Sequence, residues 1–413
     1  MKQILVIYKT GSGGGLILAN KIVASSNSAI SFEAYQVDNE NSQIKFPLIK
    51  RVFIKAKYLL NEIFKNKKVK NKFGNKRILY SAFSMNAQEL NFLNKLKAKL
   101  VNVNYDGVLI LFVGNSNFNL KSFAYVLRDN AIKPRVFWYV IDYAIFTGGC
   151  HYPRGCDGYV KRECLNCPLD TGLDKNISYF NLKTNLHFAH ELNLELVYSN
   201  PYVLSVIKNS LFNGFVSHNI RYPYLLNQVN ITSHDKINIM LDIVNINDFR
   251  KGWNELVIFI ELLNQRIISG FKFGNNEINF IFFDSKIIDF FADKIDIFGK
   301  ANIIFSLIKN KLDYSGFSKL MVETDIFLSF SNMDFGQMAL EEAILLGIPA
   351  ISFNDDFNNV FAKSELFLID KYNLFQYLEK FIFLIDVVEK KKESIVLSKK
   401  EIFVEQFVEL LNK

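Results

Sequence analysis

Four cysteines gather in one short stretch of this sequence and could ligate a metal ion. They span 18 positions with the spacing C-x5-C-x7-C-x2-C, at Cys150, Cys156, Cys164 and Cys167. The final C-x-x-C suits tetrahedral thiolate ligation of zinc, and four thiolates leave no position open for a catalytic water. The alternatives are reduced thiols in a loop and a redox pair, although this C-x-x-C does not open a helix after a strand. We therefore predict a structural zinc knuckle at 150–167.

A basic pair follows an apolar stretch in the second half of the chain. Arg250 and Lys251 precede Gly252, shortly after the run INIMLDIV at 237–244. If this run is a strand of a parallel sheet, the pair lies at the carboxyl edge, where such sheets bind ligands. The alternative is a surface loop whose cations are only solvated. The position after a strand favours a binding site.

Three carboxylates accompany a predicted helix farther along the chain. Asp334 can cap this helix, which Gly347 can end. Seven residues separate Asp334 from Glu342, so the first carboxylate lies at the helix mouth and the second lies two turns along. Both could then border one cleft. The alternative makes Asp334 a cap and places Glu341 and Glu342 on a solvated face.

A glycine-rich loop follows the first apolar run. Residues 11–15 are Gly-Ser-Gly-Gly-Gly, between the run at 4–8 and a helical run at 16–23. Glycines let a backbone approach a ligand closely, and the following helix offers free N–H groups to an anion. Neither the dinucleotide fingerprint nor a P-loop is complete here. A plain strand-to-helix turn is the alternative, and we predict instead that Gly13, Gly14 and Gly15 face a substrate.

Apolar runs of strand length recur along the chain, with amphipathic helical stretches between them. The runs stand at 4–8, 108–113, 136–141, 237–244, 278–283, 325–330 and 349–353. Continuous rather than alternating runs predict parallel sheets that are covered on both faces. The series begins again after Tyr222-Pro223. We therefore predict an α/β protein with two doubly wound, Rossmann-like lobes.

The restart of the strand series sets the predicted domain boundaries. An N-terminal domain, 1–225, carries the cysteine knuckle, and a second domain occupies 226–390. A C-terminal helix at 391–413 docks back, because Phe403, Phe407 and Leu411 share one helical face. We expect a central cleft that the glycine loop borders from one lobe, with Lys251 and Asp334 on the other.

Composition limits the partners and the location. A net charge of +8 suits an acidic partner such as a nucleotide diphosphate or an anionic membrane surface. No stretch approaches the roughly 18 to 20 apolar residues of a membrane span, so we expect a cytoplasmic protein. The stretch 65–77 holds seven Lys or Arg. We interpret it first as a solvated helix end and second as a peripheral contact with the inner face of the membrane; nucleic acid is not an expected partner.

Together these segments resemble family 4 of the retaining GT-B glycosyltransferases, in particular members that build bacterial capsule, exopolysaccharide or lipopolysaccharide. The block from Phe146 to Cys150, followed by His151 and Tyr152 and then by C-x-x-C-P, carries the resemblance most specifically. It extends more loosely over nearly the whole chain. The resemblance implies the GT-B fold and the transfer of a sugar, with retention of configuration, from a nucleotide-diphosphate sugar to a glycan or lipid-linked acceptor.

The resemblance also implies roles for single residues. Asp334 matches the first acid of the family's E-x7-E pair and would bind the donor sugar, whereas Glu342 would bind the ribose. Asp142 and the glycine loop would face the acceptor, and no divalent metal would be needed at the phosphates. The diphosphate would be held by the basic pair and the N-terminus of the following helix, at Arg250, Lys251, Phe335, Gly336 and Gln337.

Three positions depart from the family pattern. Ile141 stands where the family has a His that lines the reaction centre, and Asn245 stands where a second basic residue is expected. The Phe-Gly pair is shifted by one residue relative to the carboxylates, which makes Glu341 an alternative to Glu342. The absence of His at position 141 supports an alternative function: a non-catalytic GT-B protein that binds a nucleotide sugar or acts as a partner subunit.

Overall fold

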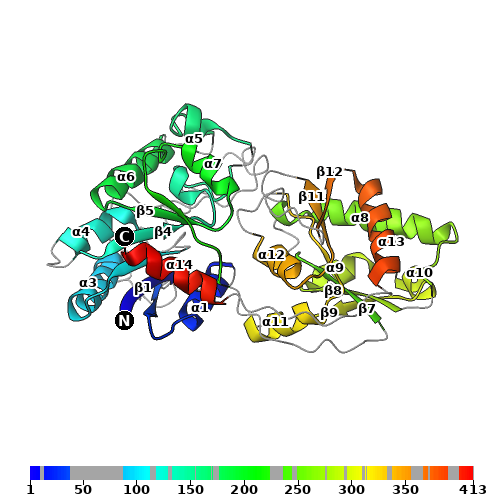
Figure 1. Ribbon diagram of the computed structural model, residues 1–413. Coiled ribbons are helices and arrows are strands. Elements are labelled where there is room, and N and C mark those ends of the chain that lie inside the picture. The colour runs from blue at the N-terminus through cyan, green and yellow to red at the C-terminus, as the bar shows by residue number, and fades with distance from the viewer. Residues whose placement is uncertain are drawn as a thin grey trace, which may run out of the picture. The chain divides into compact units, whose positions relative to one another are not determined.

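The structure is a computed structural model, shown in Figure 1. It describes residues 1–9, 14–37, 87–111, 118–128, 133–153, 155–168, 170, 176–223, 236–243, 249–274, 277–292, 295–308, 312, 314–332, 337–354, 366–370, 373–388 and 400–412. The chain splits into two compact units. The first comprises 1–198, 205–218 and 411–413, and the second comprises 199–204 and 219–410.

A six-stranded sheet forms the centre of the first unit. Its strands lie in the order β2-β1-β3-β4-β5-β6, with the bounds β1 Lys2–Lys9, β2 Ile30–Val37, β3 Gly107–Ile110, β4 Arg135–Tyr139, β5 Glu195–Tyr198 and β6 Ser217–Asn219. The pairings of β1 with β2 and β3, of β3 with β4 and of β4 with β5 are parallel. This is the order of a doubly wound sheet of the flavodoxin type.

The second unit contains another six-stranded sheet, in the order β12-β11-β10-β7-β8-β9. Its strands are β7 Lys236–Leu241, β8 Glu277–Phe282, β9 Ile303–Leu307, β10 Ile326–Leu328, β11 Ala350–Asn354 and β12 Leu366–Asp370. All five neighbouring pairs are parallel. This is the strand order of the Rossmann fold. The sequence of strands runs outward from the centre in both directions, β7-β8-β9 on one side and β10-β11-β12 on the other.

Helices pack against both sheets (Figure 1). The first unit contains α1 Gly14–Ala24, α3 Ala87–Asn102, α4 Leu120–Arg128, α5 Gly158–Lys161 and α6 Ile177–Glu191, and α7 Tyr202–Lys208 spans a boundary between the units. The second unit contains α8 Trp253–Ile268, α9 Ser285–Phe290, α10 Ile295–Lys300, α11 Tyr314–Val322, α12 Met338–Leu345 and α13 Leu374–Val388, followed by α14 Lys400–Asn412. Among the described residues, no helix is both long and apolar enough to cross a membrane.

Burial of apolar side chains explains the inner strands. Ile4, Leu5, Val6 and Ile7 of β1 are fully buried, as a strand covered on both faces requires. In the second unit, β7, β8 and β10 share a core with the apolar faces of α8 and α13. The fold prediction is confirmed: both units are doubly wound α/β structures, and each of the seven predicted runs contains or overlaps a strand.

The C-terminal helix buries the three side chains that share its predicted apolar face. Phe403 and Phe407 are fully buried, with ring centroids 5.4 Å apart, and Leu411 is 9% exposed. The helix also contacts the segment after the first unit, because the side chain of Gln406 accepts a hydrogen bond from the Arg221 N–H at 3.1 Å. Residues 389–399, which cover the predicted start of this segment, lie outside the described residues.

Candidate functional site

The switch point of the second sheet gathers polar side chains. At this point β7 and β10 are neighbours. The strands that follow them in the chain, β8 and β11, lie on opposite sides of this pair. Asp242 directly follows β7, and Ser329 directly follows β10. Open parallel sheets bind ligands outside the carboxyl ends of their strands at such a point. The position makes this cluster the first candidate for a ligand site.

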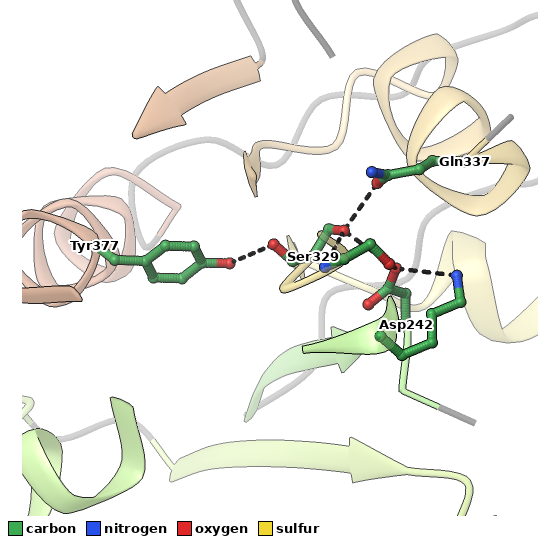
Figure 2. Close-up of polar contacts among 6 residues, drawn as sticks. Asp242, Ser329, Gln337 and Tyr377 are labelled. Atoms are coloured by element: carbon green, nitrogen blue, oxygen red, sulfur yellow. Dashed lines mark hydrogen bonds and ion pairs between the residues drawn. The ribbon is translucent and has the colours of Figure 1, made fainter. Parts of the chain in front are cut away.

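Asp242 is the centre of this cluster (Figure 2). It is 6% exposed, and one of its carboxylate oxygens, Oδ2, lies 2.7 Å from the hydroxyl of Ser331 and 3.1 Å from that of Ser329. The ammonium of Lys251 lies 3.5 Å from the same oxygen. A buried carboxylate requires such donors, because an uncompensated charge is costly away from water. The cluster therefore fixes Lys251 at the end of β7.

Gly252 determines how closely Lys251 approaches the sheet. Its φ is +69°, and a Cβ at this position would lie 1.9 Å from the Phe330 carbonyl oxygen. Only glycine satisfies both conditions. Arg250, the residue before Lys251, also contacts the chain after β10, because the Asn332 N–H donates to the Arg250 carbonyl at 2.7 Å. The short helix Phe249–Lys251 is thus held against the chain that follows β10.

Gln337 connects this cluster to α12. It precedes the helix as its N-cap residue and is 3% exposed. Its Oε1 lies 2.8 Å from the Ser329 hydroxyl. Within the described part of the chain, Gln337 Nε2 and the second oxygen of Asp242, Oδ1, are buried atoms without a hydrogen-bond partner. One buried donor and one buried acceptor are therefore available to a polar ligand or a water molecule.

Tyr377 supports the cluster from the opposite side (Figure 2). Its hydroxyl lies 3.2 Å from the Ser329 carbonyl oxygen and 3.1 Å from that of Ile351. The side chain is fully buried. Burial first and the nearby charge of Asp242 second raise the pKa of Tyr377 well above its ordinary value. The tyrosine stays neutral and fixes the ends of β10 and β11 relative to each other.

The carboxylates of α12 are buried. Glu341 is 8% exposed and Glu342 is 2% exposed. The alternative that placed them on a solvated face is therefore wrong, because α12 turns both toward the interior. The predicted donor residues Asp334, Phe335 and Gly336 lie outside the described residues.

In the first unit, Asp142 pairs with a histidine. Asp142 follows β4 and is 4% exposed. Its Oδ2 lies 2.6 Å from Nδ1 of His151, and its Oδ1 accepts the Ala144 N–H at 2.7 Å. The neighbouring backbones also pair, because the Tyr143 N–H donates to the His151 carbonyl at 3.1 Å. Asp142 thus has a histidine partner although position 141 is isoleucine.

The turn before His151 returns the chain to Asp142. The hydroxyl oxygen of Thr147 accepts the Cys150 N–H at 2.9 Å and lies 2.8 Å from the Cys150 carbonyl oxygen. Gly148 packs against the first turn of α6: a Cβ there would lie 1.9 Å from the Ser178 carbonyl oxygen. The Asn181 side chain of the same helix donates to the Gly148 carbonyl at 3.3 Å. Position 148 therefore has no room for a side chain, and the Thr147 hydroxyl closes the turn.

The predicted glycine loop lies partly outside the described residues. Gly13 is not described, and Gly14 and Gly15 form the first turn of α1. On the strand before the loop, burial lowers the pKa of Lys9 and raises that of Tyr8. The loop follows the carboxyl end of β1. The neighbouring strands β1 and β3 are followed in the chain by β2 and β4, which lie on opposite sides of this pair. This is the second switch point of the molecule.

The zinc prediction is not supported. All four cysteines line one pocket, together with Thr147, Tyr159 and Arg162. Two thiols accept backbone N–H groups, since Gly158 donates to Cys156 and Gly148 donates to Cys164, each at 3.4 Å. Among the described residues, however, no three His, Cys, Asp or Glu side chains are arranged to hold a metal ion. Sharing a pocket is insufficient, because tetrahedral ligation needs every sulfur about 2.3 Å from one centre.

Sequence reasoning did not find Asp242, Ser329 and Ser331. The signal was present, because Asp242 and Ser329 lie inside two of the apolar runs, directly after the ends of β7 and β10, and Ser331 directly follows the second run. Their contact could not be seen in the sequence, because Asp242 and Ser329 are 87 positions apart. The pairing of His151 with Asp142 was likewise not predicted. Of the predicted donor residues, Lys251 and Gln337 are connected through Asp242 and Ser329.

Comparisons with known proteins define the fold. No protein-family model matches the sequence, and no curated protein matches it significantly. A variant of TarM from S. aureus, solved with fondaparinux, α-GlcNAc-glycerol and UDP, is 12% identical, with a TM-score of 0.58 over 100% of both chains. HepE from Anabaena, solved with UDP and glucose, is 11% identical, with a TM-score of 0.52 over 100% of both chains.

A third similar structure is sucrose-phosphate synthase from Thermosynechococcus elongatus. It is 10% identical, with a TM-score of 0.53 over 94% of this chain and 92% of its own. At such low identity the comparisons concern the fold. This chain has the GT-B fold, with two Rossmann-like lobes.

Proposed function

We propose that this protein is a glycosyltransferase that moves a sugar from a nucleotide-diphosphate sugar to a glycan or lipid-linked acceptor. The observation that carries the proposal is the position of Lys251, fixed beside buried Asp242 at the switch point of the second sheet. Similar structures support a nucleotide donor, because the TarM variant was solved with UDP and HepE with UDP and glucose.

The surroundings of Lys251 suit a diphosphate. Its side chain is 20% exposed, and a cation in partly dry surroundings attracts phosphate oxygens more strongly than one in water. Arg250 belongs to the same short helix. The N-terminus of α12 adds N–H groups that favour an anion. We assign the diphosphate to Arg250, Lys251, Phe335, Gly336 and Gln337.

The carboxylates suit hydroxyl groups. Glu342 is buried in α12, and carboxylate oxygens accept hydrogen bonds from sugar hydroxyls. We assign the ribose to Glu342, with Glu341 as the alternative, and the hydroxyls of the transferred sugar to Asp334. Such contacts orient the donor, and the cations stabilise the charge that develops on the leaving diphosphate.

We further propose transfer with retention of configuration in the synthesis of a bacterial surface polysaccharide. The support is the block from Phe146 to Tyr152 and the acid pair Asp334 and Glu342. The acceptor side is assigned to Asp142 and to the loop with Gly13, Gly14 and Gly15. A cytoplasmic location at the inner face of the membrane agrees with the basic stretch 65–77.

The first test is a screen of purified protein with UDP-, GDP- and ADP-sugars, each with water or p-nitrophenyl glycosides as acceptors. We expect one donor to raise the melting temperature and to release its nucleoside diphosphate. Binding without release or transfer would replace the proposal with the non-catalytic function. A chain that neither binds nor cleaves any donor would contradict both.

The second test is Lys251→Ala. Because the cation acts most on the leaving group, turnover should fall more than donor affinity, by about 30-fold to about 1,000-fold. The matched control is Lys319→Ala, on α11 of the same unit, whose side chain is 78% exposed. The melting temperature should stay within about 2 °C in Lys319→Ala, whose side chain is exposed, whereas Lys251→Ala should melt lower because the buried Asp242 carboxylate loses its cationic partner. If Lys251→Ala keeps parental affinity and rate, Lys251 is a solvated loop residue.

A further inference from the structure

Asp242 places a negative charge beside the cation to which the donor diphosphate is assigned. Its side chain is buried, and Oδ2 lies 3.5 Å from the ammonium of Lys251. A phosphate oxygen bound to that ammonium at about 2.8 Å would lie within about 6 Å of the carboxylate, since the two distances add. The carboxylate is therefore close enough to act on a bound diphosphate.

The donors around Asp242 compensate its charge only in part. The hydroxyls of Ser331 and Ser329 and the ammonium of Lys251 all approach the same oxygen, Oδ2. Within the part of the chain that the structure describes, Oδ1 is a buried atom without a hydrogen-bond partner. The Ser329 hydroxyl also lies 2.8 Å from Gln337 Oε1, and its one hydrogen serves only one of these two acceptors at a time. The buried carboxylate thus keeps part of its negative field.

This field reaches across the cluster (Figure 2). The Tyr377 hydroxyl donates to the Ser329 carbonyl at 3.2 Å, and burial first and the charge of Asp242 second raise the pKa of this tyrosine. A negative charge disfavours a second one nearby, whether the second comes from ionisation of a tyrosine or from binding of an anion. A phosphate beside Lys251 would be subject to the same repulsion.

The backbone contacts that place Lys251 do not involve Asp242. Gly252 has a φ of +69°, and a backbone carbonyl takes the space that its Cβ would need. On the other side of the lysine, the Asn332 N–H donates to the Arg250 carbonyl at 2.7 Å. Loss of the carboxylate should therefore change the charge beside Lys251 more than the position of this residue.

We propose that Asp242 weakens binding of the nucleoside diphosphate product more than binding of the sugar donor, by repelling the terminal phosphate that the departing sugar leaves behind. The inference rests on the proposed function. A free nucleoside diphosphate carries about one negative charge more than its sugar ester, because a terminal phosphate ionises a second time at about pH 6. Asp242 is thus a specificity-determining residue that favours product release, while Lys251 attracts both ligands.

The first experiment removes the charge and keeps the shape of the side chain, with Asp242→Asn. Titration calorimetry uses UDP, GDP and ADP and their glucose esters as probes. The diphosphate that binds the parent should bind the variant about tenfold more tightly, the order expected for unit charges about 6 Å apart in surroundings between a protein surface and water. Its glucose ester should gain less.

The matched control is Asp370→Asn. Asp370 is exposed and ends β12, at the same edge of the same sheet but three strands from β7. Three strand spacings are about 14 Å, beyond the distance at which salt screens exposed charges. The control should leave the affinities for the diphosphate and for its glucose ester unchanged.

The second experiment separates repulsion from positioning. In Lys251→Ala no ammonium remains for Asp242 to position, so a carboxylate that acted only through the lysine would have no further effect. We expect Asp242→Asn, added to Lys251→Ala, to tighten binding of the diphosphate about tenfold. The double variant leaves neither charge of the pair without its partner, so this comparison remains available if Asp242→Asn alone does not fold.

Two results would overturn the inference. One is equal or weaker binding of the diphosphate by folded Asp242→Asn than by the parent. The other is equal affinity in Lys251→Ala and in the double variant, which would make Asp242 a positioning residue for Lys251. A parent that binds none of the three diphosphates and none of their glucose esters would instead contradict the proposed function itself.

Discussion

Gly252 sets the position of Lys251, the cation to which we assign the donor diphosphate. The residue has a left-handed backbone, and the Phe330 carbonyl occupies the space that a side chain would need. The basic pair can therefore approach the ends of β7 and β10 only because glycine follows it. Asp242, Ser329 and Ser331 then complete the surroundings of Lys251.

Gly252→Ala tests this close approach, with Gly270→Ala as a control. Gly270 also has positive φ, +96°, but nothing lies within 4 Å of the Cβ that it would gain. The control should lose about 1 to 2 kcal/mol of unfolding free energy, the cost of left-handed backbone. Gly252→Ala should lose at least about 3 kcal/mol, because backbone atoms must move as well. Urea denaturation measures both losses, and equal losses would show that the carbonyl contact is unimportant.

At the scale of elements, an ion cluster connects three strands of the first sheet. Arg135 of β4 binds Glu195 of β5 through two hydrogen bonds, of 2.8 and 2.7 Å, and His218 of β6 lies 2.7 Å from the same carboxylate. Burial raises the pKa of Glu195, but the bonds from Arg135 and His218 outweigh burial and lower it overall. The cluster therefore stabilises the fold when Glu195 is ionised.

Glu195→Gln tests the pH dependence that follows. Because the folded-state pKa lies below the unfolded value, the contribution is complete above the ordinary glutamate pKa of about 4.3 and is lost as pH falls through the folded value. The variant should melt lower than the parent at pH 6, and the difference should shrink toward pH 3. A difference that stays constant over this range would contradict the assignment. Glu379→Gln, whose side chain is 65% exposed, is the control.

At the scale of the whole molecule, each unit has its own sheet and contains one of the two tryptophans. Trp138 lies in β4 and is 5% exposed, whereas Trp253 opens α8 and contacts Phe290, with ring centroids 5.1 Å apart. Single-tryptophan variants can therefore report on each unit separately.

UDP should stabilise the unit that carries Lys251. At a concentration of about 100 times its Kd, a ligand adds about 2.7 kcal/mol to the stability of the part that binds it. Trp138→Phe leaves Trp253 as the reporter, and its urea midpoint should rise with UDP. Trp253→Phe leaves Trp138, whose midpoint should stay unchanged. Equal shifts of both reporters would mean that the two units unfold together.

The sequence by itself determined the fold class and most of the inner strands. Continuous apolar runs are required where both faces of a strand are covered, so such strands are visible without any partner. The missed strands are mainly β2, β6, β9 and β12, which form the sheet edges. Edge strands bury less of their surface, as the exposed Glu33 and Ala34 of β2 illustrate. The short β5 was missed because four residues give too little pattern.

Only the tertiary structure decided which side chains meet. Asp242 and Ser329 contact each other because β7 and β10 are neighbours, and no local pattern encodes a pairing across 87 residues. The same holds for His151, which reaches Asp142 through a turn that packs on α6. Cysteine spacing suggested zinc, but ligation depends on where the sulfur atoms lie in space, and sequence spacing does not determine those positions.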